Sequence, residues 1–325
     1  MDRRASIITE CALLLLALSV PMLGIYPVFA MKLMCFAIFA AAFNLLLGFA
    51  GMLSFGHAAY FGIAAYVTAW LRLNANLGPE LSILAGMISS ATLGLIVGSL
   101  AIRRQGIYFA MITLALAQCI YFVCLQAPFT GGENGIEGVP RGRVFGVISL
   151  ESDVNMYYFI LALSVFAYLA IKRIVSSPFG QILKAIGENE PRAISLGYSV
   201  NSYKLLAFVL SAGLAGLGGS LKALTLGLAT LSDVQQSTSG EVILMTLLGG
   251  TGTFLGPVLG AGIVVALQEY LSDRVGAWVT VVIGVIFVAC VMVFRRGIVG
   301  EIQFLWRRRS NHPAKVAVAK PSTVD

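Results

Sequence analysis

Residues 81–102 read LSILAGMISSATLGLIVGSLAI and contain no charged side chain. A helix needs about 20 apolar residues to cross the hydrocarbon core of a bilayer, so this stretch predicts a complete membrane crossing. The composition extends that interpretation to the whole chain, because 58% of its 325 residues belong to the set AVILMFWYC and only 11% are charged. Soluble domains carry roughly 25% charged residues to cover their water-facing surface. The sequence therefore predicts an integral membrane protein.

Ten apolar runs, separated by polar residues or by Gly and Pro, follow one another along the chain. They predict an all-α fold with about ten transmembrane helices, some of them broken or short. The expected spans are 7–30, 33–50, 55–73, 81–102, 107–127, 154–173, 204–226, 241–253, 257–272 and 277–295. The pair 241–253 and 257–272 is also compatible with a single span broken at Gly256-Pro257, or with a re-entrant segment followed by a span.

The net charge of +7 is distributed unevenly along this pattern. Most of the 22 Lys and Arg residues lie before the first span, after the fourth, around the loop 174–203, and after the last span. Ten crossings place all four groups on one side, which the positive-inside rule identifies as the cytoplasm, whereas nine would place the basic end outside. We therefore expect both termini in the cytoplasm, and we attribute the basic excess to topology rather than to binding of nucleic acid.

The sequence predicts two regions of different character. Residues 1–306 form the transmembrane domain, which includes the loop 174–203, and residues 307–325 form a basic, polar tail that is predicted to be disordered because it shows no hydrophobic periodicity. Residues 1–30 allow a second interpretation, since two arginines, an apolar run and a small-residue ending at Ala30 also resemble a cleaved signal peptide.

Two Gly-rich segments interrupt the hydrophobic pattern, LGFAGMLSFGH at 47–57 and LGGTGTFLGP at 248–257. Both contain L-G-x-x-G, which suggests two pseudo-repeated halves. Broken segments in the two halves of a membrane protein indicate a transport path, because irregular backbone at membrane depth persists only where protein or a water-filled cavity satisfies its polar groups. Tight helix packing is the alternative explanation, and His57 also fits a purely structural role. The predicted path residues are Asn44, Gly51, Ser54, His57, Tyr60, Gly250, Thr251 and Gly252.

Motifs of several enzyme classes are missing from the sequence, and we expect no enzymatic activity. It contains no H-E-x-x-H, no G-x-S-x-G and no P-loop G-x-x-x-x-G-K-[ST], so a zinc protease, an α/β-hydrolase and a P-loop ATPase are excluded. None of the five cysteines forms a C-x-x-C. No metal or cofactor is therefore predicted. The few charges inside apolar runs, at Glu10, Lys222 and Glu269, lie near predicted span ends, which argues against a proton-driven transporter.

The loop after the sixth span predicts two short helices. Ser177 can cap the first, with Pro178 in its first turn and Gly187 ending it. Asn189 can cap the second, and Gly197 terminates it. Phe179, Ile182, Leu183 and Ile186 recur at helical spacing, so the first helix has an apolar face. That face requires a partner, which is either the ends of the protein's own helices or another protein.

Four segments of the chain together resemble the permeases of ABC importers, and in particular the Liv-type M subunit for branched-chain amino acids. They are FNLLLGFAGMLSFGHAAYFG at 43–62, TGGENGI at 130–136, the loop and following helix from 177 to 221 with GQILKAIGENEPRA, and LLGGTGTFLGPVLGA at 247–261. Gly187 departs from the pattern, because the family is expected to carry a larger and often basic residue there. This glycine should shorten the first loop helix or make it more flexible.

The resemblance implies a permease subunit of the bacterial inner membrane, moved by proteins that the chain itself does not contain. The implied partners are cytosolic ATPase subunits, a sister permease, a periplasmic substrate-binding protein and the lipid bilayer. The implied substrates are Leu, Ile and Val, with relatives that handle other amino acids, short amides or urea. The residues expected to couple the chain to the ATPases are Phe179, Gly180, Lys184, Ala185, Glu188, Asn189, Glu190, Arg192 and Gly197. The rival hypotheses are a self-contained channel for a small neutral solute and a membrane enzyme of unrecognised type.

Overall fold

The computed structural model of the chain describes residues 12–23, 26–276 and, beyond them, 281–282, 284–285, 288, 292 and 297–301. The predicted span 277–295 lies largely outside the described residues. The same holds for the basic residues before the first span and for the tail 307–325. The described part is mainly helical, which agrees with the predicted all-α class.

Residues 12–19 are helical and are followed by a single 3₁₀ turn, η1 (Val20–Leu23). The longer elements are α2 (Pro27–Asn44), its π-helical continuation η2 (Leu45–Phe49), α3 (His57–Asn74), α4 (Pro79–Ala101), α5 (Ile107–Gln126), α6 (Asp153–Ser176), α7 (Pro178–Glu188), α8 (Glu190–Ser195), α9 (Val200–Leu226), α10 (Gln236–Gly249) and α11 (Gly256–Val275). Short elements are η3 (Pro128–Thr130), η4 (Leu231–Asp233) and the strands β1 (Ile136–Glu137), β2 (Arg143–Val144), β3 (Ile148–Ser149) and β4 (Leu228–Ala229).

Five of the described helices are long and apolar enough to cross a membrane: α2 with η2, α4, α5, α6 and α9. A sixth, shorter apolar segment is Gly256–Leu271 within α11. These helices agree with a multi-pass membrane protein.

One predicted boundary is wrong, and one open alternative is excluded. The break expected between 30 and 33 lies before Pro27, because Pro27 occupies the first position of α2 and the helix then runs on without interruption. Proline is favoured there, since the first helical N–H has no partner within the helix. The segment 241–272 is not one continuous span. It forms two helices that pack against each other, α10 and α11, joined by the turn 250–255.

The centre of the bundle is formed by α2 and α9, most of whose residues are buried, whereas α4, α5 and α6 bury only a minority of theirs. α9 packs against α2, α3 and α4. Small residues allow these close crossings: a Cβ at Gly219 of α9 would overlap the carbonyl oxygen of Phe61 on α3. Thr68 Oγ1 also donates a hydrogen bond to Ser220 Oγ at 2.8 Å across the same crossing.

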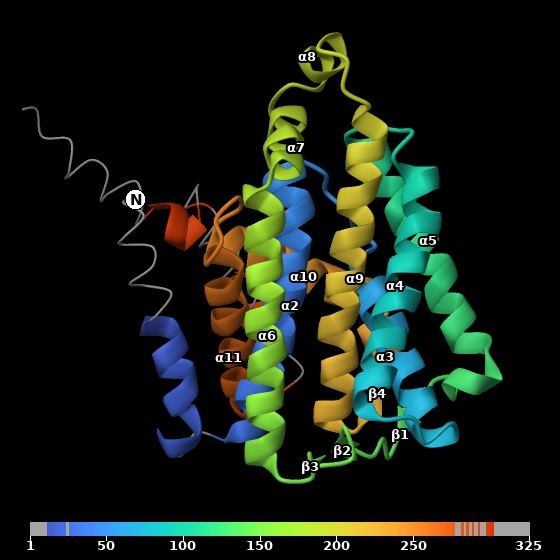
Figure 1. Cartoon of the computed structure of the whole chain (residues 1–325), viewed down its shortest axis with the longest axis vertical. Coiled ribbons are helices and arrows are strands. Elements are labelled where there is room, and N and C mark those ends of the chain that lie inside the picture. The colour runs from blue at the N-terminus through green and yellow to red at the C-terminus, as the bar shows by residue number, and fades with distance from the viewer. Residues whose placement is uncertain are drawn as a thin grey trace, which may run out of the picture.

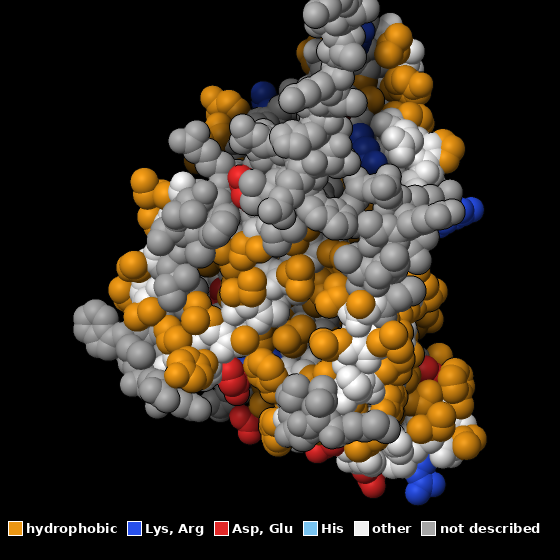
Figure 2. Space-filling view, turned by 90° about the vertical axis from the view of Figure 1, so that its left-hand side faces the viewer, with side chains coloured by type: hydrophobic (Ala, Val, Ile, Leu, Met, Phe, Trp, Pro, Cys, Tyr) orange, Lys and Arg blue, Asp and Glu red, His pale blue; other side chains and the backbone are white. Residues whose placement is uncertain are grey.

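The two ends of the bundle differ in structure (Figure 1). One end carries α7 and α8, and the opposite end carries the four short strands. β1 pairs antiparallel with β4, with Ile136 opposite Ala229, and β2 pairs with β3. Figure 2 shows hydrophobic side chains over the middle of one face, with acidic side chains along its lower edge, the end of the strands.

The strand end is a folded cap rather than an open loop. Arg72, near the end of α3, donates from Nε to the carbonyl oxygen of Pro140 at 3.0 Å. Arg141 pairs with Asp153 at 2.5 Å and also donates to the carbonyl oxygen of Thr225 at 3.2 Å. These arginines attach the segment between α5 and α6 to three helices of the bundle.

Candidate functional site

The two Gly-rich breaks lie against each other, although they are separated by about two hundred residues of chain. Asn44, the last residue of α2, donates from Nδ2 to the carbonyl oxygen of Thr253 at 2.9 Å. Its Oδ1 accepts a hydrogen bond from the backbone N–H of Gly252 at 3.0 Å. One amide side chain therefore ties the end of α2 to the turn 250–255.

Glycine is required at this junction for two reasons. A Cβ at Gly48 would overlap both Asn44 Oδ1 and the backbone nitrogen of Gly252, so only glycine permits the approach of the two segments. Gly51 and Gly252 adopt φ values of 69° and 72°, a region that side chains with a Cβ rarely occupy. Between Asn44 and Gly51 the chain leaves the α-helix through the π-helical turn η2. Such turns are frequent at functional sites.

His57 and Tyr60 lie in a different environment from Asn44. His57 is fully buried in the first turn of α3, with its ring centroid 5.9 Å from that of Phe39 and 5.3 Å from that of Phe43. Its Nε2 lies 3.0 Å from Ser211 Oγ on α9. Tyr60 is buried with its ring edge-on to Phe208. This packing supports the structural alternative for His57, and a role of either residue in the path stays a prediction.

The start of α3 is held by two side chains that the sequence analysis did not select, together with Ser54 of the predicted path. Ser239 Oγ of α10 accepts a hydrogen bond from the N–H of Ala58 at 2.9 Å, and Thr113 Oγ1 of α5 accepts one from the N–H of Phe55 at 3.2 Å. Ser54, which is fully buried, accepts a longer bond of 3.4 Å from the N–H of Gly56. The sequence contains a signal for Ser239, because it belongs to the polar run at 235–240 that directly precedes the predicted span 241–253.

The loop between α6 and α9 forms the two short helices that the sequence predicts. Ser177 Oγ accepts from the N–H of Gly180 at 3.3 Å, and Asn189 Oδ1 accepts from the N–H of Arg192 at 3.1 Å, so both predicted N-caps are confirmed. The expectation that the first helix ends at Gly187 is off by one residue. That this glycine shortens the helix or makes it more flexible stays a prediction. α7 continues to Glu188, because Asn189 adopts the extended backbone of the next cap.

The apolar face of α7 packs onto the protein's own helices, which supports the first of the two alternatives. Leu183 and Ile186 are buried, and the ring of Phe179 stacks on Tyr203 of α9 at 5.6 Å. Gly180 lies at the corner between α6 and α7, where a Cβ would overlap the carbonyl oxygen of Val175.

Glu190, the first residue of α8, is fully engaged within the chain. Its Oε2 pairs with Lys204 Nζ of α9 at 2.6 Å, and its Oε1 accepts from Gln105 Nε2 at 2.8 Å. The exposed surface of the helix pair is formed by other residues. From the predicted coupling set, those exposed are Ala185, Glu188, Asn189, Arg192 and Gly197, and Lys184 is partly exposed.

Three large side chains at the tip of the helix pair are exposed and were not selected from the sequence. Ile194, Leu196 and Tyr198 expose 56%, 70% and 41% of their surface. They lie in α8 or directly after it, and α8 is at the end of the molecule farthest from the strands (Figure 1). They follow the buried face of α7 in sequence, so periodicity alone did not distinguish them from core residues.

Of the three charges predicted inside apolar segments, Glu10 lies outside the described residues, and Lys222 and Glu269 have partners. Lys222 of α9 forms an ion pair with Asp233 of η4, and both are buried. Thr230 donates to the second carboxylate oxygen of Asp233 at 3.2 Å from both its N–H and its hydroxyl. Lys32 pairs with Glu269 at 3.0 Å. These contacts join α9 to η4, and α2 to α11.

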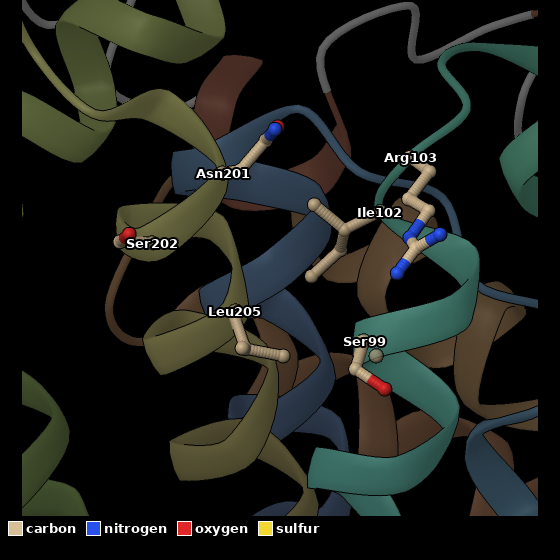
Figure 3. Close-up of a pocket in the computed structure, with 7 residues that line it drawn as sticks. Ser99, Ile102, Arg103, Asn201, Ser202 and Leu205 are labelled. Carbon is tan, nitrogen blue, oxygen red and sulfur yellow. The ribbon is translucent and has the colours of Figure 1, made fainter.

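A pocket of about 210 Å³ lies between α4 and α9 at the end that carries α7 and α8 (Figure 3). Ile102 and Leu205 point into the gap between the two helices, whereas Ser202 points away from it. The polar groups around the pocket therefore do not converge on one point. Its lining residues are Gly98, Ser99, Ile102, Arg103, Asn201, Ser202 and Leu205, none of which belongs to the predicted path.

Comparison with known proteins gives a consistent result. Residues 27–291 match the family described as branched-chain amino acid transport system / permease component. The high-affinity branched-chain amino acid transport system permease protein LivM of Salmonella typhimurium is 29% identical over 264 residues, which cover 74% of this chain and 62% of that protein. LivM of Escherichia coli is 28% identical over the same coverage. The autoinducer 2 import system permease protein LsrC of Yersinia enterocolitica is 29% identical over 221 residues, 65% of this chain and 59% of that protein. The chain thus spans less than two thirds of the length of these relatives. No solved structure matches it.

Proposed function

We propose a function from one premise, that this chain belongs to the family of permease components of branched-chain amino acid transport systems. It is a membrane-spanning subunit of an ATP-driven importer, and it carries Leu, Ile or Val across the bacterial inner membrane. Cytosolic ATPase subunits bind it at α7 and α8, a sister permease completes the channel, and a periplasmic binding protein delivers the substrate. The observation that carries the proposal is the family match over 27–291, combined with a doubly capped helix pair at one end of the bundle.

The proposed orientation places α7 and α8 in the cytoplasm and the strand cap outside. It is supported by the basic residues that flank the helix pair, Arg103, Arg104, Lys172, Arg173 and Arg192, according to the positive-inside rule. Ten crossings in two pseudo-repeated halves, with both termini in the cytoplasm, are part of this proposal.

The proposed path runs beside the joined breaks at 44–56 and 250–255. A path for a branched-chain amino acid requires an apolar lining with a few polar groups for the zwitterion. Thr251 is exposed in the turn and is the best placed of the predicted residues to contact a solute. The Asn44 side chain is hydrogen-bonded to the backbone of Gly252 and Thr253, so we assign it a structural role beside the path rather than contact with the solute.

The proposed contact with the ATPase uses the exposed tip. Ile194, Leu196 and Tyr198 supply apolar surface, and Glu188, Asn189 and Arg192 are exposed polar residues of the same helix pair. Exposed apolar side chains rimmed by polar residues are typical of protein interaction sites.

A related small solute is the second candidate substrate. It is favoured by the similarity to LsrC, a protein named for autoinducer 2 import. Competition distinguishes the two, because excess unlabelled Ile or Val inhibits leucine uptake by a branched-chain importer and leaves uptake of an unrelated solute unchanged.

The test is uptake of labelled leucine into proteoliposomes that contain the purified complex and the loaded binding protein. We expect uptake to require ATP, the ATPases and the binding protein. Full-rate transport by the chain alone, without nucleotide, would identify a self-contained channel and overturn the proposal.

A further inference from the structure

We propose that α7 acts on the path directly, by pressing on the π-helical break η2, and that Phe49 and Gly187 are the positioning residues that transmit the movement. The inference rests on the proposed function and adds to it the route by which an ATPase bound at α7 and α8 reaches the path.

The first observation is a backbone contact between α7 and the break. A Cβ at Gly187 would lie 3.1 Å from both the carbonyl carbon of Ala50 and the carbonyl oxygen of Phe49. The same contact is found from the partner segment, because a Cβ at Gly51 would lie 3.5 Å from Gly187 Cα. Because the neighbouring atoms belong to the backbone, they cannot turn aside as a side chain would. The last turn of α7 thus rests on residues 49–51, and a side chain at Gly187 would crowd this backbone contact.

The second observation is a row of side chains that starts from the same helix. Lys184 Nζ lies 5.5 Å from the centroid of the Phe49 ring, in the geometry of a cation–π contact. Phe49 also contacts Phe254, with ring centroids 5.6 Å apart and tilted by 36°. Phe49 therefore contacts both α7 and the turn 250–255.

The third observation is the link made by Asn44. It binds the backbone of Gly252 and Thr253 from the end of α2, immediately before η2. A displacement of residues 45–51 is consequently shared with the turn 250–255, so both Gly-rich breaks move together. A movement transmitted through packed groups requires such a contiguous chain of contacts.

The π-helical turn is the deformable part of this route. Most of α2 is buried on all sides, so a push along its length meets a packed core. In η2 the hydrogen bonds leave the α pattern, and the chain then runs without regular structure to His57. A segment with irregular bonds can change its geometry without breaking a long α-helix.

The competing route runs through α9, because Phe179 stacks on Tyr203 and Glu190 pairs with Lys204. Substitutions at Phe49 and Gly187 separate the two routes, since neither residue belongs to these α9 contacts.

The experiment measures leucine uptake and ATP hydrolysis together in proteoliposomes with the full complex. The variants are Phe49→Ala and Gly187→Val. Their matched controls are Phe122→Ala, an exposed phenylalanine of α5, and Gly262→Val, where a Cβ would meet Leu33 Cδ1 at an ordinary 3.9 Å. Phe49→Tyr serves as the conservative variant that retains the ring.

We expect both test variants to lower the amount of leucine imported per ATP hydrolysed by about tenfold, a change within the usual range of coupling between sites. ATP hydrolysis and the amount of co-purified ATPase should stay at the wild-type level, and the two controls and Phe49→Tyr should remain coupled.

Unchanged import per ATP in both test variants would overturn the inference. So would a parallel loss of import, hydrolysis and co-purified ATPase, which would show that the variants disturb docking alone. A wild-type complex that imports no leucine would instead refute the proposed function.

Discussion

At the scale of single residues, a few polar side chains determine how the broken helices meet. Asn44 satisfies one donor and one acceptor of a turn that lies 208 positions away along the chain. Lys222 and Asp233 neutralise each other in a buried site. In both cases a group that would be costly to bury alone has become a link between two elements.

Asn44→Ala removes both hydrogen bonds to the turn and leaves the N–H of Gly252 and the carbonyl of Thr253 without this partner. Loss of a partner by buried polar groups costs about 1–3 kcal/mol, so we expect a lower midpoint of thermal unfolding in detergent and slower uptake. Asn44→Asp keeps the acceptor for Gly252 but turns a buried carboxylate oxygen toward the carbonyl oxygen of Thr253, so its unfolding midpoint should fall at least as far as that of Asn44→Ala. A midpoint equal to that of the wild type in Asn44→Ala would show that this link contributes nothing.

The buried pair of Lys222 and Asp233 predicts a strongly non-additive double variant. Removing one partner leaves an uncompensated buried charge, which costs about 3–5 kcal/mol, whereas replacing both by apolar residues is often close to neutral. We therefore expect Lys222→Met and Asp233→Leu to reduce the yield of folded protein when made separately. The double variant should regain most of that yield, measured as the monodisperse fraction in size-exclusion chromatography. Equal losses that simply add would contradict the proposed mutual neutralisation.

At the scale of elements, the sequence predicted the loop helices well and the ends of the membrane helices poorly. Ser177, Asn189 and Gly197 are local signals whose side-chain or backbone chemistry acts within a few residues, and each occupies the place expected of it. Apolar runs carry few such signals, so the start of α2 was placed after Ala30 instead of at Pro27.

The candidate site was only partly predictable for a different reason. Both Gly-rich breaks were identified from composition, but their contact depends on how α2, α10 and α11 pack, which no local pattern encodes. Gly187 illustrates the point. Its sequence context predicted a helix end, whereas the structure uses its missing side chain for a contact with residues 49–51.

The exposed tip of α8 leads to a prediction about assembly. Leu196→Asp places a charge on the most exposed of the three apolar side chains there, and we expect it to reduce the ATPase that co-purifies with the permease. Val147→Asp is the matched control, since Val147 is 83% exposed on the strand end. Co-purification of ATPase at the wild-type level with Leu196→Asp would exclude this surface as its docking site.

At the scale of the whole molecule, the two ends of the bundle differ in structure, and the proposed function assigns them different tasks. One end presents a helix pair with an exposed apolar tip, and the other presents a cap attached by Arg72 and Arg141. An importer driven from the cytoplasm needs its force to enter at one end and its substrate to enter at the other. The proposed import function therefore requires that the end with α7 and α8 lies in the cytoplasm.

That orientation can be measured with two single cysteines in a background from which the five native cysteines have been removed. In intact spheroplasts, a thiol reagent that cannot cross membranes should label Val147→Cys in the β2–β3 hairpin and should leave Leu196→Cys unlabelled. In inside-out vesicles the pattern should be reversed, because α8 then faces the reagent. Both positions are well exposed, so accessibility within the protein does not limit either reaction. Labelling of Leu196→Cys from outside would place the helix pair outside the cytoplasm, where no ATPase could drive it.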